Sequence, residues 1–175
     1  ATDGAGLTQT CTFRVIVNDT EAPTMSCPAA LNANASPGQC GAAVTYSTPT
    51  YTDNCAPTSG TAVRVSGPPS GSTFSVGVTN VVFRATDAAS NTRQCTLTVT
   101  VVDNQPPTIS CPPSITVTGN GTPCKATVFY AVPTASDNCA GTLTPYLVSG
   151  FASGSNFPAG TTVNTWRASD PGGVT

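Results

Sequence analysis

Alternation of apolar and polar residues is the clearest pattern in this chain. Residues 95–101 (CTLTVTV) place an apolar side chain at every second position, which is typical of a β-strand buried on one face. Residues 11–17 (CTFRVIV) follow the same pattern, except where Ile16 interrupts it. Gly, Pro, Asn, Asp and Ser separate the apolar stretches, and no stretch shows the 3.6-residue period of a helix. Shorter strands are predicted at residues 43–47, 61–66, 80–87, 127–131, 143–149 and 163–168.

The cysteines reveal an internal repeat. Four pairs are each separated by 84 positions: Cys11 and Cys95, Cys27 and Cys111, Cys40 and Cys124, Cys55 and Cys139. The neighbouring residues repeat with them, because the Asp-Asn-Cys-Ala sequence at 53–56 returns at 137–140, and Ser-Cys-Pro at 26–28 returns at 110–112. Four cysteines in register with their flanking motifs establish a tandem repeat.

The repeat divides the chain into three parts at its Asp-x-x-x-Pro junctions. Residues 20–103 form one whole unit, and residues 104–175 form a second unit that lacks its closing strand. Residues 1–19 supply the closing strands of a preceding repeat or of a neighbouring subunit. About seven short strands per unit, with a hairpin turn expected at 87–91, predict an all-β fold of tandem immunoglobulin-like antiparallel β-sandwiches.

Composition excludes several classes of function. The chain has no histidine, so it has neither a Ser-His-Asp triad nor an imidazole metal site, and we expect no enzymatic activity. Six Lys and Arg residues and a net charge of −2 do not make a surface for nucleic acid. No apolar run approaches the roughly 18 residues of a membrane helix, so we expect no membrane insertion. Eight cysteines in 175 residues favour an oxidising, extracellular or cell-surface location.

Several motifs occur in order along essentially the whole chain. They are D-x-x-x-P-x-x-x-C-P at 19–28 and 103–112, D-N-C at 53–55 and 137–139, G-S-x-F-x-x-G at 71–77 and 154–160, and the closing C-T-x-x-V at 11–15 and 95–99. With these motifs the chain resembles the hyalin repeat (HYR) family of extracellular immunoglobulin-like modules. The resemblance implies a role in adhesion or structure and brings no catalytic residues.

The cysteines are expected to form disulfides that staple the sandwiches. Four positions per repeat allow three connectivities, and the residues alone leave these open. Hyalin repeats with two cysteines look to retain the one before Pro and the one on the closing strand. The resemblance therefore implies that Cys27 pairs with Cys95. It then also implies the pairs Cys40–Cys55 and Cys124–Cys139.

This pairing leaves Cys11 and Cys111 without partners. If the chain is a complete subunit, strand 9–18 should insert into the open domain of the next subunit, where Cys11 would bond Cys111. Alternatively, residues 1–175 are a window of a longer tandem array, which we favour because natural chains seldom start inside a hairpin. Both alternatives predict that a strand fills the edge next to residues 104–175.

Recurring acids and sequons suggest two further kinds of site. Calcium at the domain junctions would use Asp19 or Asp103, but one or two carboxylates would hold it loosely, and Asx turns are the favoured explanation. Otherwise we expect no cofactor. N-glycosylation sequons begin at Asn18, Asn34 and Asn120.

The leading interpretation is a structural extracellular protein whose sandwiches form a rod or filament. Its partners would be copies of itself, or adjacent repeats of the same chain, joined head to tail. The alternative is an adhesion or binding module that recognises a glycan or a cell-surface receptor. Phe74, Phe83, Phe157 and Trp166 are expected to pack in cores rather than to stack on sugars.

Overall fold

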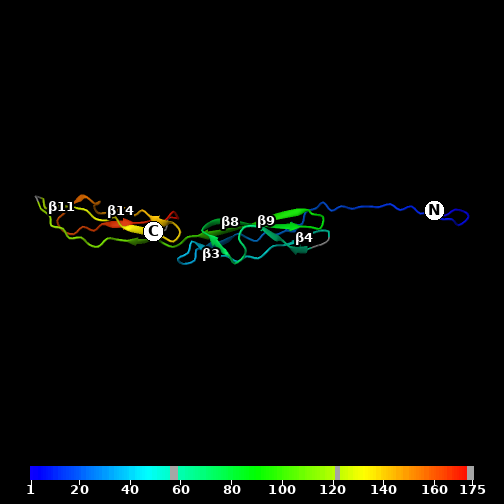
Figure 1. Ribbon diagram of the computed structural model, residues 1–175, viewed down its shortest axis with the longest axis horizontal. Coiled ribbons are helices and arrows are strands. Elements are labelled where there is room, and N and C mark those ends of the chain that lie inside the picture. Colours follow the sequence, from blue (N-terminus) through cyan, green and yellow to red (C-terminus); the bar gives the residue numbers. More distant parts are fainter. Residues whose placement is uncertain (56–58, 121–122, 173–175) are drawn as a thin grey trace.

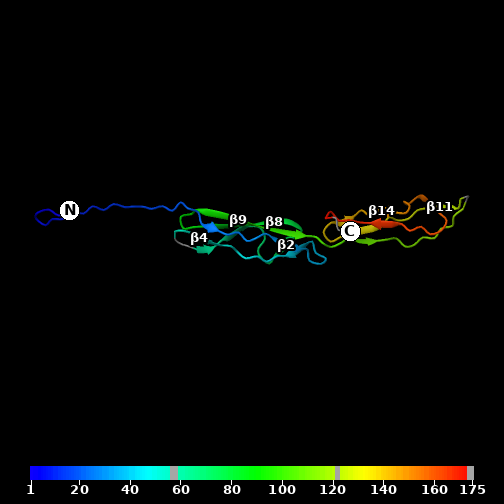
Figure 2. The ribbon, with the colours of Figure 1, turned by 180° about the vertical axis from the view of Figure 1, so that it is seen from behind.

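The computed structural model of the chain describes residues 1–55, 59–120 and 123–172. These residues form sixteen strands and no helix, so the predicted all-β fold is confirmed. The molecule is elongated, with two β-sandwiches end to end and residues 1–18 extending away from the first (Figures 1 and 2). We call residues 1–19 the arm, residues 20–103 the first repeat and residues 104–175 the second repeat.

The first repeat is built around one four-stranded sheet in the order β2-β9-β8-β6. Its strands are β2 (Leu31–Asn34), β9 (Thr92–Val102), β8 (Gly77–Thr86) and β6 (Val63–Ser66). A smaller antiparallel sheet contains β1 (Thr24–Met25), β4 (Thr50–Thr52) and β5 (Ser59–Thr61). Another pairs β3 (Gly41–Ala43) with β7 (Thr73–Ser75). All these pairs are antiparallel except β2 with β9, which is parallel.

Strand β9 supplies the centre of the first core, as its alternating pattern predicts. Leu97 and Val99 are 0% exposed and Val101 is 2% exposed, while Thr96 is exposed. The expected turn at 87–91 joins β9 to β8, because Asp87 Oδ1 accepts a hydrogen bond from the Asn91 N–H at 2.8 Å. The long β8–β9 hairpin is therefore the framework on which the other strands assemble.

The second repeat contains shorter strands and no sheet of four among its described residues. One sheet has three strands, β10 (Thr108–Ser110), β12 (Thr134–Asp137) and β13 (Gly141–Leu143). A second sheet pairs β11 (Lys125–Val128) with β15 (Ser155–Pro158). A third pairs β14 (Tyr146–Ser149) with β16 (Thr165–Arg167). Residues 115–118, which correspond to β2, form no strand. Since β2 is held by pairing with β9, the loss of a closing strand also removes its neighbour from the sheet.

Each repeat is centred on a tyrosine that sequence analysis did not identify. Tyr46 packs edge-on against Phe74 at 6.4 Å and Phe83 at 5.8 Å between ring centroids. Tyr130 packs in the same way against Phe157 and Trp166, both at 6.4 Å. The 84-residue offset of the two tyrosines was a signal that could have found them.

Hydrogen bonds from a serine displace the strand predicted at residues 43–47. Strand β3 ends at Ala43. Beyond it, the Tyr46 N–H donates to Ser70 Oγ, and the Ser70 hydroxyl donates to the Tyr46 carbonyl, both at 2.8 Å. Ser153 binds Tyr130 in the same way, which explains why β11 ends at Val128 rather than at residue 131.

The arm begins with a small hairpin and continues without partners. Thr2 pairs with Thr8, and Asp3 Oδ1 accepts the Leu7 N–H at 2.9 Å, as Asp87 accepts that of Asn91. Residues 9–18 are exposed and form no ladder, so the strand predicted at 11–17 is not present as a strand. A strand requires a neighbour to satisfy its backbone groups, and the described residues provide none.

Candidate functional site

The junction between the two repeats is formed around the turn at residues 36–40. The Gly38 N–H donates to Gln105 Oε1 at 2.6 Å, and Gln105 Nε2 donates to the Ser36 carbonyl at 3.1 Å. Asn138 Nδ2 donates to the Gln39 carbonyl at 2.9 Å. Two amide side chains of the second repeat thus bind the backbone of the first, which orients one sandwich on the other.

A disulfide between Cys40 and Cys139 crosses the same junction. Their Cα atoms are 4.8 Å apart, and 99 positions separate them in the sequence. This bond corrects the predicted pairings Cys40–Cys55 and Cys124–Cys139, since Cys55 and Cys124 are free and exposed thiols in the structure.

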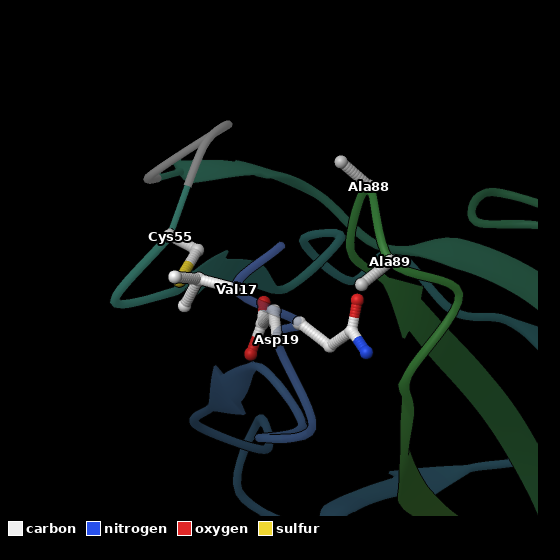
Figure 3. A pocket seen from close by; sticks show the side chains of 6 residues that line it. Val17, Asp19, Cys55, Ala88 and Ala89 are labelled. Carbon is white, nitrogen blue, oxygen red and sulfur yellow. The ribbon is translucent and has the colours of Figure 1, made fainter. Parts of the chain in front are cut away.

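The correction follows from the position of each cysteine along the sandwich. Cys40 lies at the end of the first repeat that faces the second. Cys55 lines a pocket of about 510 Å³ at the opposite end, together with Val17, Asp19 and Ala88 (Figure 3). The two cysteines of the first repeat therefore lie at different ends of the sandwich. Cys40 is bonded to the adjacent repeat and not to Cys55.

A second disulfide links Cys27 to Cys95 within the first repeat, with 5.6 Å between their Cα atoms. Cys95 is 4% exposed and lies on β9, so the bond ties the segment before β2 to the closing strand. The corresponding positions in the rest of the chain, Cys11 and Cys111, are both free and exposed.

Two carboxylates and a cysteine sulfur gather at the start of each repeat. Ligand atoms of Asp19, Asp53 and Cys55 lie within 4.8 Å of one another, as do those of Asp103, Asp137 and Cys139. In each cluster the middle Asp accepts the cysteine N–H through Oδ1, at 2.9 Å in Asp53 and 2.8 Å in Asp137. The Asx turns favoured from the sequence are thus present.

The electrostatics of these clusters follow from those bonds. Hydrogen bonds from the backbone N–H groups of Ala140 and Cys139 lower the pKa of Asp137 below its usual 3.8. Desolvation, followed by the negative charge of Asp19, raises the pKa of the Cys55 thiol. Calcium prefers six to eight oxygen ligands, and two carboxylates supply at most four. Calcium at Asp19 or Asp103 therefore stays a prediction.

The second repeat has an open groove where the first has its closing strand. The groove has a volume of about 780 Å³, and its floor includes Val128, Tyr130, Phe157 and Trp166. Cys111 and Ile115 also line the groove, and Ile115 is 50% exposed. Phe157 is half-buried, whereas its counterpart Phe74 is only 1% exposed in the closed first repeat. Val128 and its counterpart Val44 are both buried, at 8% and 7% exposed.

The arm displays the side chains that would fill such a groove. Phe13 is 85% exposed, Val15 74% and Val17 92%. Their counterparts 84 positions later, on β9, are the buried Leu97, Val99 and Val101. Identical spacing with opposite burial shows that the arm has the pattern of a closing strand without a sandwich to close.

The three sequon asparagines are all accessible. Asn18 lies on the arm, Asn34 at the end of β2, and Asn120 before β11, and each is exposed. Residues 121 and 122 of the last sequon lie outside the described residues. Glycosylation of these side chains remains a prediction.

Comparison with known proteins gives one family. The model of the HYR domain matches twice, at residues 18–101 and 102–175. The chain is 36% identical to Hyalin of Lytechinus variegatus over 171 residues, which cover 94% of this chain and 30% of that protein. It is 36% identical to Hyalin of Strongylocentrotus purpuratus over 93% of this chain and 13% of that protein.

A further relative has a different domain composition. The Sushi, von Willebrand factor type A, EGF and pentraxin domain-containing protein 1 of Rattus norvegicus is 34% identical over 164 residues, 90% of this chain and 4% of that protein. The chain thus spans less than a third of each of these relatives. No solved structure matched significantly, and no helix among the described residues is long and apolar enough to cross a membrane. Two consecutive matches that together cover nearly the whole chain show that it belongs to the HYR domain family.

Proposed function

We propose that this chain is a structural, adhesion-type extracellular repeat protein without a catalytic role. Its sandwiches lie end to end in a rod or filament, and the open second repeat is completed by the arm of a following copy. Membership of the HYR family supports the extracellular assignment, as does a chain with two disulfides and very few charges.

The observation that carries this proposal is the opposite burial of matching residues in the arm and β9. Phe13, Val15 and Val17 leave apolar surface in water, and burying each would contribute roughly 1.5–3 kcal/mol. The groove of the second repeat exposes the complementary surface on Tyr130 and Trp166. Strand addition would cover both surfaces and pair the backbone groups of residues 9–18.

The covalent chemistry supports the same register. In the first repeat, the closing strand is bonded through Cys95 to Cys27. The free thiols of Cys11 and Cys111 hold the corresponding positions on the arm and beside the groove. An arm docked as β9 docks would bring Cys11 to Cys111. A head-to-tail contact of this kind does not close on itself and generates a filament.

Non-reducing electrophoresis of the oxidised protein, followed by disulfide mapping, tests the proposal. We expect a ladder of covalent oligomers and a peptide that links Cys11 to Cys111. Val15→Asp should abolish association by placing a charge in the groove, whereas Thr12→Asp, on the alternate face, serves as the matched control. A wild-type chain that remains monomeric at high concentration, with residues 9–18 still open to proteolysis, would contradict strand donation.

A further inference from the structure

Docking of the arm would pair Cys11 with Cys111 and would leave two other thiols free. Cys55 and Cys124 are both exposed and unbonded. Within the 84-residue repeat, Cys55 corresponds to Cys139 and Cys124 corresponds to Cys40. Those counterparts are bonded to each other across the junction between the first and second repeats.

Cys55 has the local structure of its bonded counterpart. Its N–H donates to Asp53 Oδ1 at 2.9 Å, and the Cys139 N–H donates to Asp137 Oδ1 at 2.8 Å. Asp19 lies beside Cys55 as Asp103 lies beside Cys139. Figure 3 shows Cys55 beside the pocket that Val17 and Asp19 of the arm line together with the first repeat.

Cys124 likewise matches Cys40. Each immediately precedes the first strand of a corresponding pair, since Cys40 leads into β3 and Cys124 into β11. The Cys40 carbonyl accepts the Val76 N–H at 3.4 Å, and the Cys124 carbonyl accepts the Ala159 N–H at 3.1 Å. Strand β11, which follows Cys124, lies at the end of the second repeat away from the first (Figure 1), and the Cys124 side chain is exposed and lines the groove.

We propose that Cys124 of one copy forms a disulfide with Cys55 of the next, so that every junction carries the bond seen between Cys40 and Cys139. This inference rests on the proposed head-to-tail docking. If the arm of the next copy binds as β9 does, the repeat that follows the arm must sit where the second repeat sits on the first. Each junction between copies then holds two bonds, Cys11–Cys111 and Cys124–Cys55.

One polar contact of the junction has its donor in place for a junction between copies. Asn54 corresponds to Asn138 and here donates to Glu21 Oε2 at 2.8 Å. On docking, Asn54 would donate to the carbonyl of Pro123, the counterpart of Gln39. Glu21 stands where Gln105 binds the turn, and its carboxylate can accept an N–H but cannot donate. Glu21 therefore cannot repeat the hydrogen bond that Gln105 Nε2 donates to the Ser36 carbonyl.

Formation of the bond requires an oxidant, for which a low-molecular-weight disulfide suffices. The Cys124 thiolate attacks one sulfur of this disulfide, which gives a mixed disulfide and releases one small thiolate. The Cys55 thiolate then attacks the Cys124 sulfur, forming the Cys55–Cys124 bond and expelling the second small thiolate. Two electrons pass from the cysteines to the oxidant, and the two cysteine protons end on the two small thiols.

The test is disulfide mapping of the full chain assembled in a glutathione redox buffer at about pH 8.5, since Cys55 has a raised pKa. We expect peptides that link Cys55 to Cys124 and Cys11 to Cys111 in the same oligomers. The double variant Cys11→Ser/Cys111→Ser should keep the ladder through Cys55–Cys124 alone. The double variant Cys55→Ser/Cys124→Ser should keep it through Cys11–Cys111 alone, and only all four substitutions together should abolish it.

The outcomes separate this inference from the proposed function. A ladder with Cys11–Cys111 linked but Cys55 and Cys124 free, or bonded as Cys40–Cys55 and Cys124–Cys139, would overturn the inference and leave strand donation standing. Absence of any oligomer in every variant would overturn both. Oligomers that lack Cys11–Cys111 but contain Cys55–Cys124 would uphold the junction bond and contradict docking of the arm.

Discussion

The first and second repeats share their motifs but differ in how completely they are packed. In the first repeat, Phe74, Phe83, Leu97 and Val99 are at most 1% exposed. In the second, the counterparts Phe157 and Trp166 are only half-buried and border an open groove. The difference lies in one strand, β9, which has no counterpart among the described residues of the second repeat. A closing strand therefore completes the core and also organises its neighbours, since the residues equivalent to β2 form no strand without it.

The largest effect is expected when the second repeat receives its own closing strand. A permuted chain with residues 9–19 moved to follow residue 175 keeps the repeat in register, because residues 168–175 correspond to 1–8. Burial of three apolar side chains should raise the unfolding free energy of this repeat by about 5 kcal/mol or more. Denaturant titration followed by the fluorescence of Trp166, the single tryptophan, measures it.

The permuted chain also separates the two consequences of a closing strand. In the permuted chain, Cys11 should bond Cys111 of the same molecule. Non-reducing electrophoresis should therefore show no oligomers linked through Cys11. If Trp166 unfolds at the same denaturant concentration in the permuted and original chains, the groove is not a site for this strand.

A smaller effect is expected from matched truncations on the two equivalent strands. Leu97→Ala removes a fully buried side chain and should cost roughly 2–5 kcal/mol of the stability of the first repeat. Phe13→Ala, at the corresponding position of the arm, should leave the stability of the monomer within about 0.5 kcal/mol of the original.

In the assembled protein, Phe13→Ala should be destabilising. In oligomers the Phe13→Ala variant should dissociate at lower denaturant concentration than the original chain, because the side chain is buried only on docking. Circular dichroism of dilute and of concentrated samples makes the comparison. Equal loss from both substitutions in the monomer would show that the arm already packs on its own molecule.

The smallest effect is expected on the acid dependence of stability, and it concerns Asp137, in the loop at the junction between the repeats. The pKa of Asp137 is lowered in the fold by backbone N–H donors, so its carboxylate stabilises the folded state at every pH above its usual pKa of 3.8. This contribution is lost as the pH falls below that value. Asp137→Asn should therefore lower the melting temperature slightly at neutral pH and reduce its decrease between about pH 5 and pH 2.

A second Asx-turn variant serves as the control for this prediction. Asp3→Asn, in the isolated hairpin of the arm, alters a similar Asx turn that is exposed and far from any sandwich. It should leave the melting temperature and its acid dependence unchanged. A similar acid dependence in Asp137→Asn and in the original chain would mean that other carboxylates govern acid unfolding.

Local patterns predicted most of the fold. The alternation at 95–101 marked the core strand, and the Asp and Asn at 87–91 marked its turn, because period-two burial and Asx turns depend on neighbouring residues alone. The same alternation at 11–17 predicted a strand that does not form here. That residues 11–17 are a closing strand stays a prediction, because pairing depends on a partner, and residues 1–55, 59–120 and 123–172 form no ladder with them.

Cysteine pairing shows where sequence reasoning stopped. The spacing of 84 residues established which cysteines are equivalent and predicted the tandem β-sandwiches; a closing strand beside the second repeat stays a prediction. It did not show that Cys40 and Cys55 lie at opposite ends of one sandwich. That became clear only from the folded chain, because a disulfide requires Cα atoms roughly 4.4–6.8 Å apart, and this distance depends on which end of the sheet each loop occupies.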